Sequence, residues 1–458
     1  MAEYDLIVVG GGPAGYVGAI RAAQLGKKVA CVEMDRAGGT CLNWGCIPTK
    51  SLLKNAELYR KLAHHSEEFG LKIEGLSYEW DKIIGRSRKV SDRLAGGIEM
   101  LFKKNKVTYI RGEASVPKSG VVEVTDSEGK KQSYTADKLL LATGCVTRDM
   151  PGFPFNGTSV IGSKQAMVLS EQPKDIIIIG AGAIGIEFAY FFNAFGSKVT
   201  VVEMQDNILP VEDNEVSKTL EKSLTKQGIR ILTGTKVEKA EKTNKGVRIT
   251  VSGKAEEKLE AAIALVAIGV LPLVPQGLKL DLDRGYIKTK DNYETSVPGV
   301  YAAGDIIGPP WLAHVASWEA VQAVEGMFAG RSPKKVSIFP GCTYCQPQVA
   351  SVGLTEQAAK EKKIPYKVGK FPFLASGKAL AVGESEGFVK IIFGEKHKEV
   401  LGAHIIGADA TEMIAEMGLA INMEATQEEL AETIHAHPTL SEAIMEAAHA
   451  AEGHAIHI

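Results

Sequence analysis

The sequence has little cysteine and almost no net charge. Six cysteines in 458 residues are too few for a disulfide scaffold. A net charge of −2 gives no electrostatic reason to expect binding to nucleic acid or to an anionic membrane surface. The first residues lack the basic region and the cleavage site of an export signal, so we expect a cytoplasmic protein.

Long apolar runs are also scarce. One segment, residues 176–195, carries the single charge of Glu187 over twenty residues, which is long enough to cross a bilayer. Three glycines at the spacing of a dinucleotide loop, and the polar Asn193, interrupt it. We therefore predict a buried strand, turn and helix here, and no membrane span.

Two dinucleotide-binding fingerprints are present. Each has an apolar strand, a GxGxxG turn, a helix, and a second strand that ends in glutamate. The landmark residues of the first are Gly10, Gly12, Gly15 and Glu33, and those of the second are Gly180, Gly182, Gly185 and Glu203. The carboxylate of Glu203 suits a free ribose 2′-hydroxyl and repels a 2′-phosphate, which favours NAD(H) over NADP(H).

A pair of cysteines follows the first fingerprint. Cys41 and Cys46 lie within GGTCLNWGCIPTK, ahead of an apolar-periodic run that predicts a helix. A helix N-terminus lowers the pKa of a nearby thiol, and thiolates attack disulfides. The pair is therefore a candidate redox centre, and two buried structural cysteines are the alternative.

Turn-rich segments divide the chain into four predicted parts. They are residues 1–148, 149–269, 270–336 and 337–458. The last part carries no nucleotide loop. Its strand-like runs at 349–352, 388–393 and 400–406 alternate with amphipathic stretches at 409–422, 427–434 and 440–451. This pattern predicts an α+β domain with its own antiparallel sheet.

The two fingerprints, GGTCLNWGCIPTK, TSVPGVYAAGD and HAHPTLSE together resemble the FAD-dependent pyridine nucleotide–disulfide oxidoreductases, over essentially the whole chain. Within that family the motifs are most similar to members that oxidise dihydrolipoamide. The resemblance implies an α/β fold with two Rossmann-like domains, one for FAD and one for NAD, and a C-terminal α+β dimerisation domain.

The resemblance also implies roles for individual residues. Cys41 and Cys46 would form the redox disulfide, with Cys41 facing the substrate dithiol and Cys46 facing the flavin. Lys50 would lie by the flavin and pair with Glu187. The implied FAD contacts are Gly10, Gly12, Gly15, Glu33, Thr40, Lys50, Ala114, Asp305 and Ala313. The implied NAD contacts are Gly180, Gly182, Gly185, Glu203 and Gly269.

His437 would be the general base, oriented by Glu442. Dithiols have pKa values of about 8.5 or above, so their attack at neutral pH needs a base, and histidine titrates in that range. The resemblance implies a homodimer in which this histidine serves the other subunit. It further implies lipoyl domains and the acyltransferase core of 2-oxo acid dehydrogenase complexes, or a glycine cleavage system, as partners.

Several features leave alternatives open. No arginine follows Gly269, where family members often carry one. The extra pair Cys342 and Cys345 is predicted to be structural, with metal binding or redox activity as the alternative. No metal site is predicted. Glutathione-type reductases usually read NADPH through arginines that are absent after Glu203, and mercuric reductases usually end in paired cysteines that are absent after Cys345. A regulatory subunit that retains FAD without turnover is the alternative outside the enzyme class.

Overall fold

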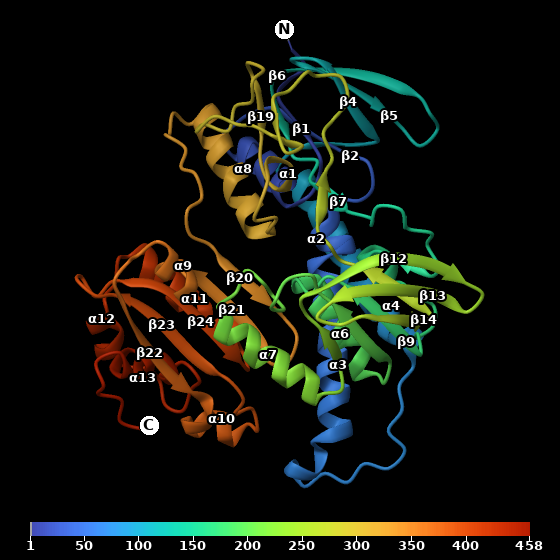
Figure 1. Cartoon of the computed structure of the whole chain (residues 1–458). Helices are drawn as coiled ribbons and strands as arrows, with labels where there is room; N and C mark the ends of the chain where they lie inside the picture. Colours follow the sequence, from blue (N-terminus) through green and yellow to red (C-terminus); the bar gives the residue numbers. More distant parts are fainter. Residues whose placement is uncertain (1) are drawn as a thin grey trace. The chain divides into compact units, whose positions relative to one another are not determined.

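The computed structural model describes residues 2–458, and the chain divides into two compact units (Figure 1). Unit 1 comprises the chain up to Ser51, residues 82–148 and residues 269–337. Unit 2 comprises residues 52–81, 149–268 and 338–458. The four-part division made from the sequence stays a prediction at its boundaries.

Unit 1 is built on a seven-stranded sheet in the order β3-β2-β1-β6-β5-β4, with β19 also paired to β6. Its strands are β1 (Tyr4–Val9), β2 (Val29–Glu33), β3 (Thr108–Arg111), β4 (Glu113–Lys118), β5 (Val121–Thr125), β6 (Lys131–Leu141) and β19 (Val300–Ala302). The pairs that join β3, β2, β1, β6 and β19 are parallel. Such strands are buried on both faces, which explains their continuous apolar runs.

Two helices, α1 (Pro13–Gln24) and α8 (Ala313–Phe328), pack against each other and against this sheet (Figure 1). Their approach is close, because a Cβ on Gly18 of α1 would lie 2.8 Å from the side chain of Leu140. The other elements of unit 1 include η2 (Asp305–Ile307) and a small sheet of β7 (Cys145–Thr147) and β16 (Val270–Pro272). Helix α4 (Trp80–Lys104) lies mostly in this unit.

The first part of unit 2 is a parallel sheet in the order β11-β10-β9-β15-β8. Its strands are β8 (Val160–Ile161), β9 (Asp175–Ile179), β10 (Lys198–Val202), β11 (Arg230–Leu232) and β15 (Ile263–Val266). Helix α6 (Ala183–Ala194) follows β9, so the apolar segment 176–195 is a strand, turn and buried helix, as predicted. A meander of β12 (Thr235–Thr243), β13 (Gly246–Gly253) and β14 (Glu257–Ala261) is attached.

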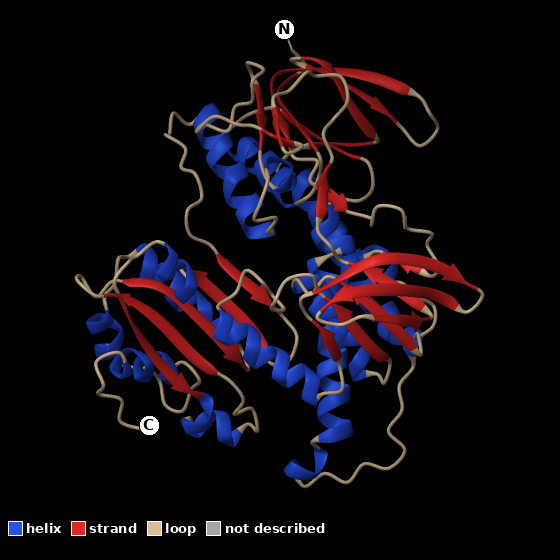
Figure 2. Ribbon diagram, in the orientation of Figure 1, coloured by secondary structure: helices blue, strands red, loops and turns tan. Residues whose placement is uncertain are grey.

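The C-terminal part of unit 2 contains an antiparallel sheet, as the sequence predicted (Figure 2). Its strand order is β20-β21-β24-β23-β22. Its strands are β20 (Pro340–Thr343), β21 (Gln348–Gly353), β22 (Tyr366–Pro372), β23 (Phe388–Gly394) and β24 (Val400–Gly407). Helices α11 (Ala410–Asn422) and α13 (Glu442–Ala450) pack on it, and α12 (Gln427–Glu432) contacts α13.

Helix α7 (Asn214–Lys226) of the parallel-sheet part contacts β24 of the antiparallel sheet (Figure 1). The remaining short elements are η1 (Ser66–Phe69), α5 (Ser163–Ala166), β17 (Leu282–Asp283), β18 (Tyr286–Ile287), α9 (Glu356–Glu361), η3 (Phe373–Ala375) and α10 (Gly377–Ala381). Among residues 2–458, no helix has both the length and the apolar character needed to cross a membrane.

Candidate active site

The first glycine loop, at the end of β1, requires glycine at two positions. Gly10 has φ +103°, and a Cβ there would lie 2.3 Å from the carbonyl oxygen of Ala142. A Cβ on Gly15 would lie 1.8 Å from the carbonyl oxygen of Gly10. Gly12 is the N-cap of α1, and within residues 2–458 no side chain caps this end. The first N–H groups of α1 are thus suited to bind a pyrophosphate.

Glu33 is held over this loop by the backbone. Its carboxylate accepts hydrogen bonds from the N–H of Gly11 at 2.7 Å and the N–H of Asp35 at 2.8 Å. Burial raises the pKa of Glu33, while the N–H donors act in the opposite direction. The carboxylate lies at the carboxyl end of β2, where a ribose hydroxyl is bound in dinucleotide folds.

The second loop, in unit 2, repeats the main contacts of the first. Gly180 has φ +100° and a Cβ there would lie 2.5 Å from the carbonyl oxygen of Ala267. A Cβ on Gly185 would lie 2.0 Å from the carbonyl oxygen of Gly180. Glu203 accepts from the N–H of Ala181 at 2.7 Å, just as Glu33 does in the first loop. The internal repeat predicted from the sequence is therefore confirmed in three dimensions, and both loops fit a dinucleotide.

The cysteine stretch is joined to the first glycine loop. The N–H of Gly38 donates to the carbonyl oxygen of Gly11 at 2.8 Å. Gly39 has φ +57°, and a Cβ there would lie 2.5 Å from the Cα of Gly12. Gly39 is thus required for this close approach, and a Cβ on Gly38 would instead lie 2.6 Å from the side chain of Leu42. Cys41 lies inside α2 (Gly39–Trp44), and Cys46 is the first residue of α3 (Cys46–His64).

The two thiols hydrogen-bond each other. The pKa of Cys41 is raised, first by its hydrogen bond to Cys46 and then by burial, although the Lys50 ammonium acts in the opposite direction. The lowered pKa expected for a thiol at a helix N-terminus is therefore wrong for Cys41. Cys41 does lie in the first turn of α2, but the hydrogen bond to Cys46 and burial outweigh the effect of the helix N-terminus on its pKa.

Two side chains that the sequence did not single out brace the cysteine helix. The Nδ2 group of Asn43 donates to the carbonyl oxygens of Ala37 and Gly39 at 3.1 and 2.9 Å. Arg88 on α4 donates to the carbonyl oxygen of Asn43 at 2.7 Å, and its guanidinium lies 4.9 Å from the ring centroid of Trp44. Arg88 is far away in the sequence and belongs to no motif, so no local signal could have identified it.

Asp305 follows a strained turn at the end of β19. The preceding Gly304 has φ +80° and donates its N–H to the carboxylate of Glu319 at 2.9 Å. Burial raises the pKa of Asp305 to about 6 and the pKa of Glu319 to about 7. Ala313 begins α8, and within residues 2–458 no side chain caps this helix. Glu319 is a third residue that the sequence reasoning missed.

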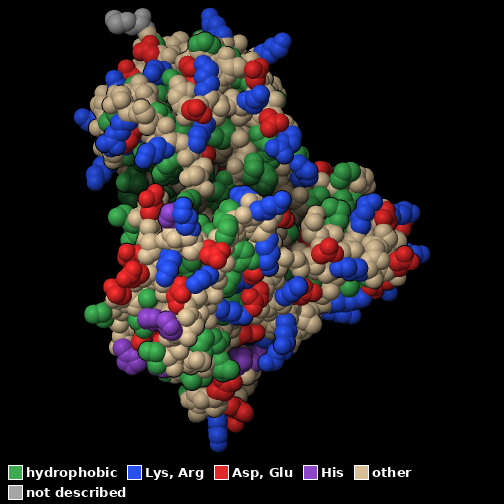
Figure 3. All heavy atoms as spheres, turned by 60° about the vertical axis from the view of Figure 1, so that its left-hand side comes forward, with side chains coloured by type: hydrophobic (Ala, Val, Ile, Leu, Met, Phe, Trp, Pro, Cys, Tyr) green, Lys and Arg blue, Asp and Glu red, His purple; other side chains and the backbone are tan. Residues whose placement is uncertain are grey.

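His437 and Glu442 lie together, as the sequence predicted. Nδ1 of His437 is 2.9 Å from Oε1 of Glu442, and Oε2 of Glu442 accepts the N–H of Thr439 at 2.8 Å. Burial alone would raise the pKa of Glu442, but these two hydrogen bonds lower it below its ordinary value. The His437 side chain is 79% exposed, and Figure 3 shows histidine side chains at the surface. The pair has the arrangement of an oriented base.

The other predicted residues lie as follows. Glu187 on α6 accepts the N–H of Tyr344 at 3.0 Å, and its predicted pairing with Lys50 stays a prediction. Gly269 has φ +111° and accepts the N–H of Arg148 at 3.0 Å. Ala114 lies on β4 and Thr40 lies on α2. Their contacts with FAD stay predictions.

The extra cysteines, Cys342 and Cys345, lie in or against the packed interior of the protein. Cys345 is buried, and its Sγ lies 3.3 Å from the carbonyl oxygen of Pro347. Cys342 is on β20 and packs against the core of the antiparallel sheet. Among residues 2–458, no group of three His, Cys, Asp or Glu side chains is arranged to hold a metal ion.

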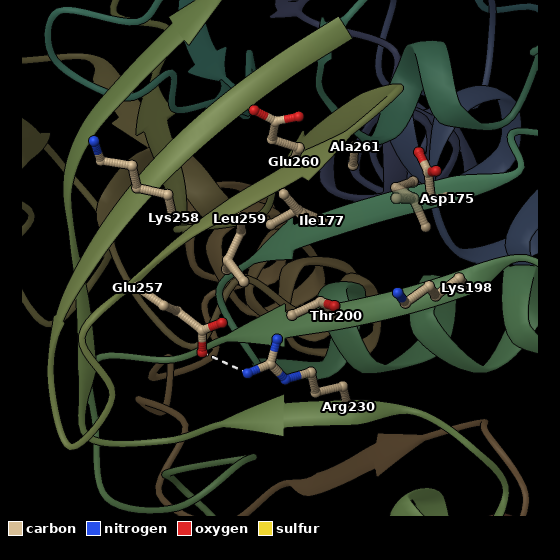
Figure 4. A pocket seen from close by; sticks show the side chains of 11 residues that line it. Asp175, Ile177, Lys198, Thr200, Arg230, Glu257, Lys258, Leu259, Glu260 and Ala261 are labelled. Carbon is tan, nitrogen blue, oxygen red and sulfur yellow. Dashed lines mark hydrogen bonds and ion pairs between the residues drawn. The ribbon is translucent and has the colours of Figure 1, made fainter. Parts of the chain in front are cut away.

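A pocket of about 200 Å³ lies in unit 2 (Figure 4), and no residue of the second glycine loop is among those that line it. It is lined by Asp175 and Lys198, which begin β9 and β10, and by residues of β14. Arg230 and Glu257 form an ion pair beside it. Dinucleotides bind at the carboxyl ends of parallel strands, so this pocket at the amino ends is not the nucleotide site.

The chain belongs to the pyridine nucleotide-disulphide oxidoreductase family. The family pattern matches residues 4–320, and the pattern of the family's dimerisation domain matches residues 339–448. The protein is accordingly a flavoprotein oxidoreductase that uses FAD and NAD(H).

Named relatives narrow the similarity. Dihydrolipoyl dehydrogenase of Chlorobaculum parvum is 44% identical over 98% of this chain and 97% of its own. Dihydrolipoyl dehydrogenase of Bacillus subtilis is 44% identical over 99% of each chain. Among solved structures, LpdA from Mycobacterium tuberculosis superposes with a TM-score of 0.89 at 26% identity, over 97% of this chain and 98% of that one.

Proposed function

We propose that the chain oxidises dihydrolipoamide to lipoamide with reduction of NAD⁺. The observation that supports this most is the thiol pair fixed on the first glycine loop by the bond from Gly38 to Gly11. That bond places a dithiol–disulfide couple against the loop that would hold the pyrophosphate of FAD. The balanced reaction is dihydrolipoamide plus NAD⁺ giving lipoamide, NADH and one proton.

The chain's own residues supply the thiol chemistry. One substrate thiol loses its proton to His437 and attacks the sulfur of Cys41 in the Cys41–Cys46 disulfide. The Cys46 thiolate leaves, and the second substrate thiol then attacks the mixed disulfide, which releases cyclic lipoamide and leaves Cys41 reduced. When bound, FAD supplies a two-electron carrier between thiol and nicotinamide chemistry.

Each group has a structural reason for its role. Glu442 fixes the proton of His437 on Nδ1, which leaves Nε2 as the basic atom. The hydrogen bond to Cys46, and then burial, raises the pKa of Cys41, so Cys41 is suited to hold a proton when the pair is reduced. The N–H groups at the starts of α1 and α6 would bind the phosphates of FAD and NAD(H) respectively.

We further propose a homodimer. His437 is highly exposed, and nearby apolar side chains are exposed as well, including Ile434 at 96%, Met423 at 71% and Leu419 at 65%. A second copy of the chain would cover this surface and receive the histidine. The proposed partners are lipoyl domains and the acyltransferase core of 2-oxo acid dehydrogenase complexes, or a glycine cleavage system. A reducing cytoplasm suits this reversible disulfide.

The test compares His437→Gln with His457→Gln. His457 is a matched control, because its Nδ1 pairs with Glu446 at 2.7 Å and its side chain is 65% exposed. We expect His437→Gln to lower kcat for dihydrolipoamide about 10²- to 10⁴-fold while FAD content is unchanged. His457→Gln should turn over normally. Near-normal turnover of His437→Gln would overturn the assigned base, and absence of dihydrolipoamide oxidation by the parent protein would overturn the function.

A further inference from the structure

Lys390, on β23 of the antiparallel sheet, is a buried cation. Its side chain is 2% exposed, and its Nζ lies 3.0 Å from Oδ1 of Asp213 and 2.7 Å from Oε2 of Glu356. A third carboxylate, that of Glu215, lies 3.3 Å away. Burying an ammonium group is costly unless it is paired, so three acidic partners mark this as a fixed junction.

Asp213 belongs to the parallel-sheet part of unit 2. It is the N-cap of α7, and its carboxylate also accepts the N–H groups of Glu215 at 3.0 Å and of Glu356 at 3.2 Å. Burial alone would raise the pKa of Asp213, but the Lys390 ammonium outweighs it and holds the pKa below its ordinary value. The junction therefore ties the start of α7 to β23 through charged groups.

A chain of hydrogen bonds continues from this junction to the second glycine loop. The N–H of Ser217 donates to the carbonyl oxygen of Asp213 at 3.0 Å, and its Oγ donates to the carbonyl oxygen of Leu209 at 3.2 Å. The N–H of Leu209 donates to the carbonyl oxygen of Ala181 at 2.9 Å. Ala181 in turn donates its N–H to Glu203.

Leu209 is the constrained link of this path. It is 2% exposed and has φ +43°, a backbone conformation that residues other than glycine seldom adopt. Such a residue keeps its conformation only where its surroundings hold it. The hydroxyl of Ser217 and the N–H of Glu212, at 2.9 Å, both bind the carbonyl oxygen of Leu209, and the glycine loop binds its N–H group.

We propose that Lys390, through Asp213 and Ser217, is a positioning residue for the NAD(H) site. It sets the backbone at Leu209 against the glycine loop, and so sets the geometry in which Ala181 and Glu203 meet the nucleotide. This inference rests on the proposed function, because it assigns NAD(H) to the second loop. The antiparallel sheet, which carries no nucleotide loop, thereby takes part in nucleotide binding.

The test uses Ser217→Ala in the FAD-loaded protein, because it removes one link and leaves the charges in place. Ser223→Ala is the matched control: Ser223 is on the same helix and 3% exposed, and its Oγ donates to Glu386 at 2.9 Å, away from the path. We expect Ser217→Ala to raise the Kd for NADH about fivefold, which corresponds to about 1 kcal/mol, while Ser223→Ala changes it less than twofold.

Two further variants, Lys390→Met and Asp213→Asn, should raise the Kd for NADH in the same direction. Kinetically, the KM for NAD⁺ should rise while the KM for dihydrolipoamide and the FAD content stay unchanged. A purely structural role would lower Tm equally in Ser217→Ala and Ser223→Ala and leave the Kd for NADH unchanged. An unchanged Kd in folded Ser217→Ala and Asp213→Asn overturns the inference alone. A parent protein that does not bind NADH overturns the proposed function as well.

Discussion

Replacing Glu212 by glutamine should remove a pH dependence of stability. Glu212 is 6% exposed and precedes the N-cap of α7. It interacts with the hydroxyl of Ser351, and its Oε2 has no hydrogen-bond partner among residues 2–458. Burial, reinforced by the neighbouring charge of Asp213, raises its pKa from 4.5 to about 7.

The sign follows from proton binding. Between pH 4.5 and 7 the folded protein holds a proton on Glu212 that the unfolded chain has released, so this group stabilises the fold most below pH 4.5. The stabilisation is lost as the pH rises through 7. Each pKa unit corresponds to about 1.4 kcal/mol, so the full effect is about 3 kcal/mol, most of which falls between pH 5 and 8.5.

The assay is urea unfolding of the FAD-loaded protein at several pH values between 5 and 8.5, with parent and variant measured in parallel. The free energy of unfolding of Glu212→Gln should rise by about 3 kcal/mol relative to that of the parent protein over this range. Glu361→Gln, at an exposed position at the end of α9, controls for loss of one negative charge. A constant difference between parent and Glu212→Gln at every pH would refute the reasoning.

Three further predictions concern the cofactors. Gly15→Ala should abolish FAD retention, and Gly185→Ala should abolish NADH binding while FAD is retained, because each new Cβ would lie 2.0 Å or less from a backbone oxygen. Normal FAD absorbance in Gly15→Ala, or normal NADH binding by equilibrium dialysis in Gly185→Ala, would show that the loop is not a cofactor site. The kcat/KM for NADP⁺ should be about 100-fold below that for NAD⁺, since like charges at Glu203 cost several kcal/mol, and Glu203→Ala should narrow the ratio; equal values in the parent protein would remove this argument. Glu319→Leu leaves the N–H of Gly304 unpaired and should raise the Kd for FAD about tenfold, whereas Glu319→Gln keeps an acceptor and should leave the Kd unchanged. A normal Kd for FAD in Glu319→Leu would show that the turn does not need this acceptor.

The repeated part of the fold was predictable because its signals are local. A dinucleotide loop is specified by a few glycines and one acidic residue in a short stretch, so Gly10 and Glu33 could be paired with Gly180 and Glu203 from the sequence. The C-terminal helices were predicted to within a few residues because their apolar positions recur at helical spacing.

Other parts of the site could not be found in this way. Arg88 and Glu319 act through contacts outside their own stretch of sequence, as does Lys390 in the role proposed for it, and no motif surrounds them. Strand β22 was not predicted, because Lys367 and Lys370 interrupt its apolar pattern on a half-exposed strand. The direction of the Cys41 pKa depends on a hydrogen bond between side chains, which sequence spacing does not specify.

The bond from Gly38 to Gly11 has a consequence for protein engineering. It makes the glycine loop and the thiol stretch one backbone assembly, in which Gly39 also lies against Gly12. A chimera that imports residues 10–15 from a relative must therefore import residues 38–46 from the same source. Exchanging either segment alone would join two surfaces that did not evolve to fit, at the place where thiols and cofactor must meet.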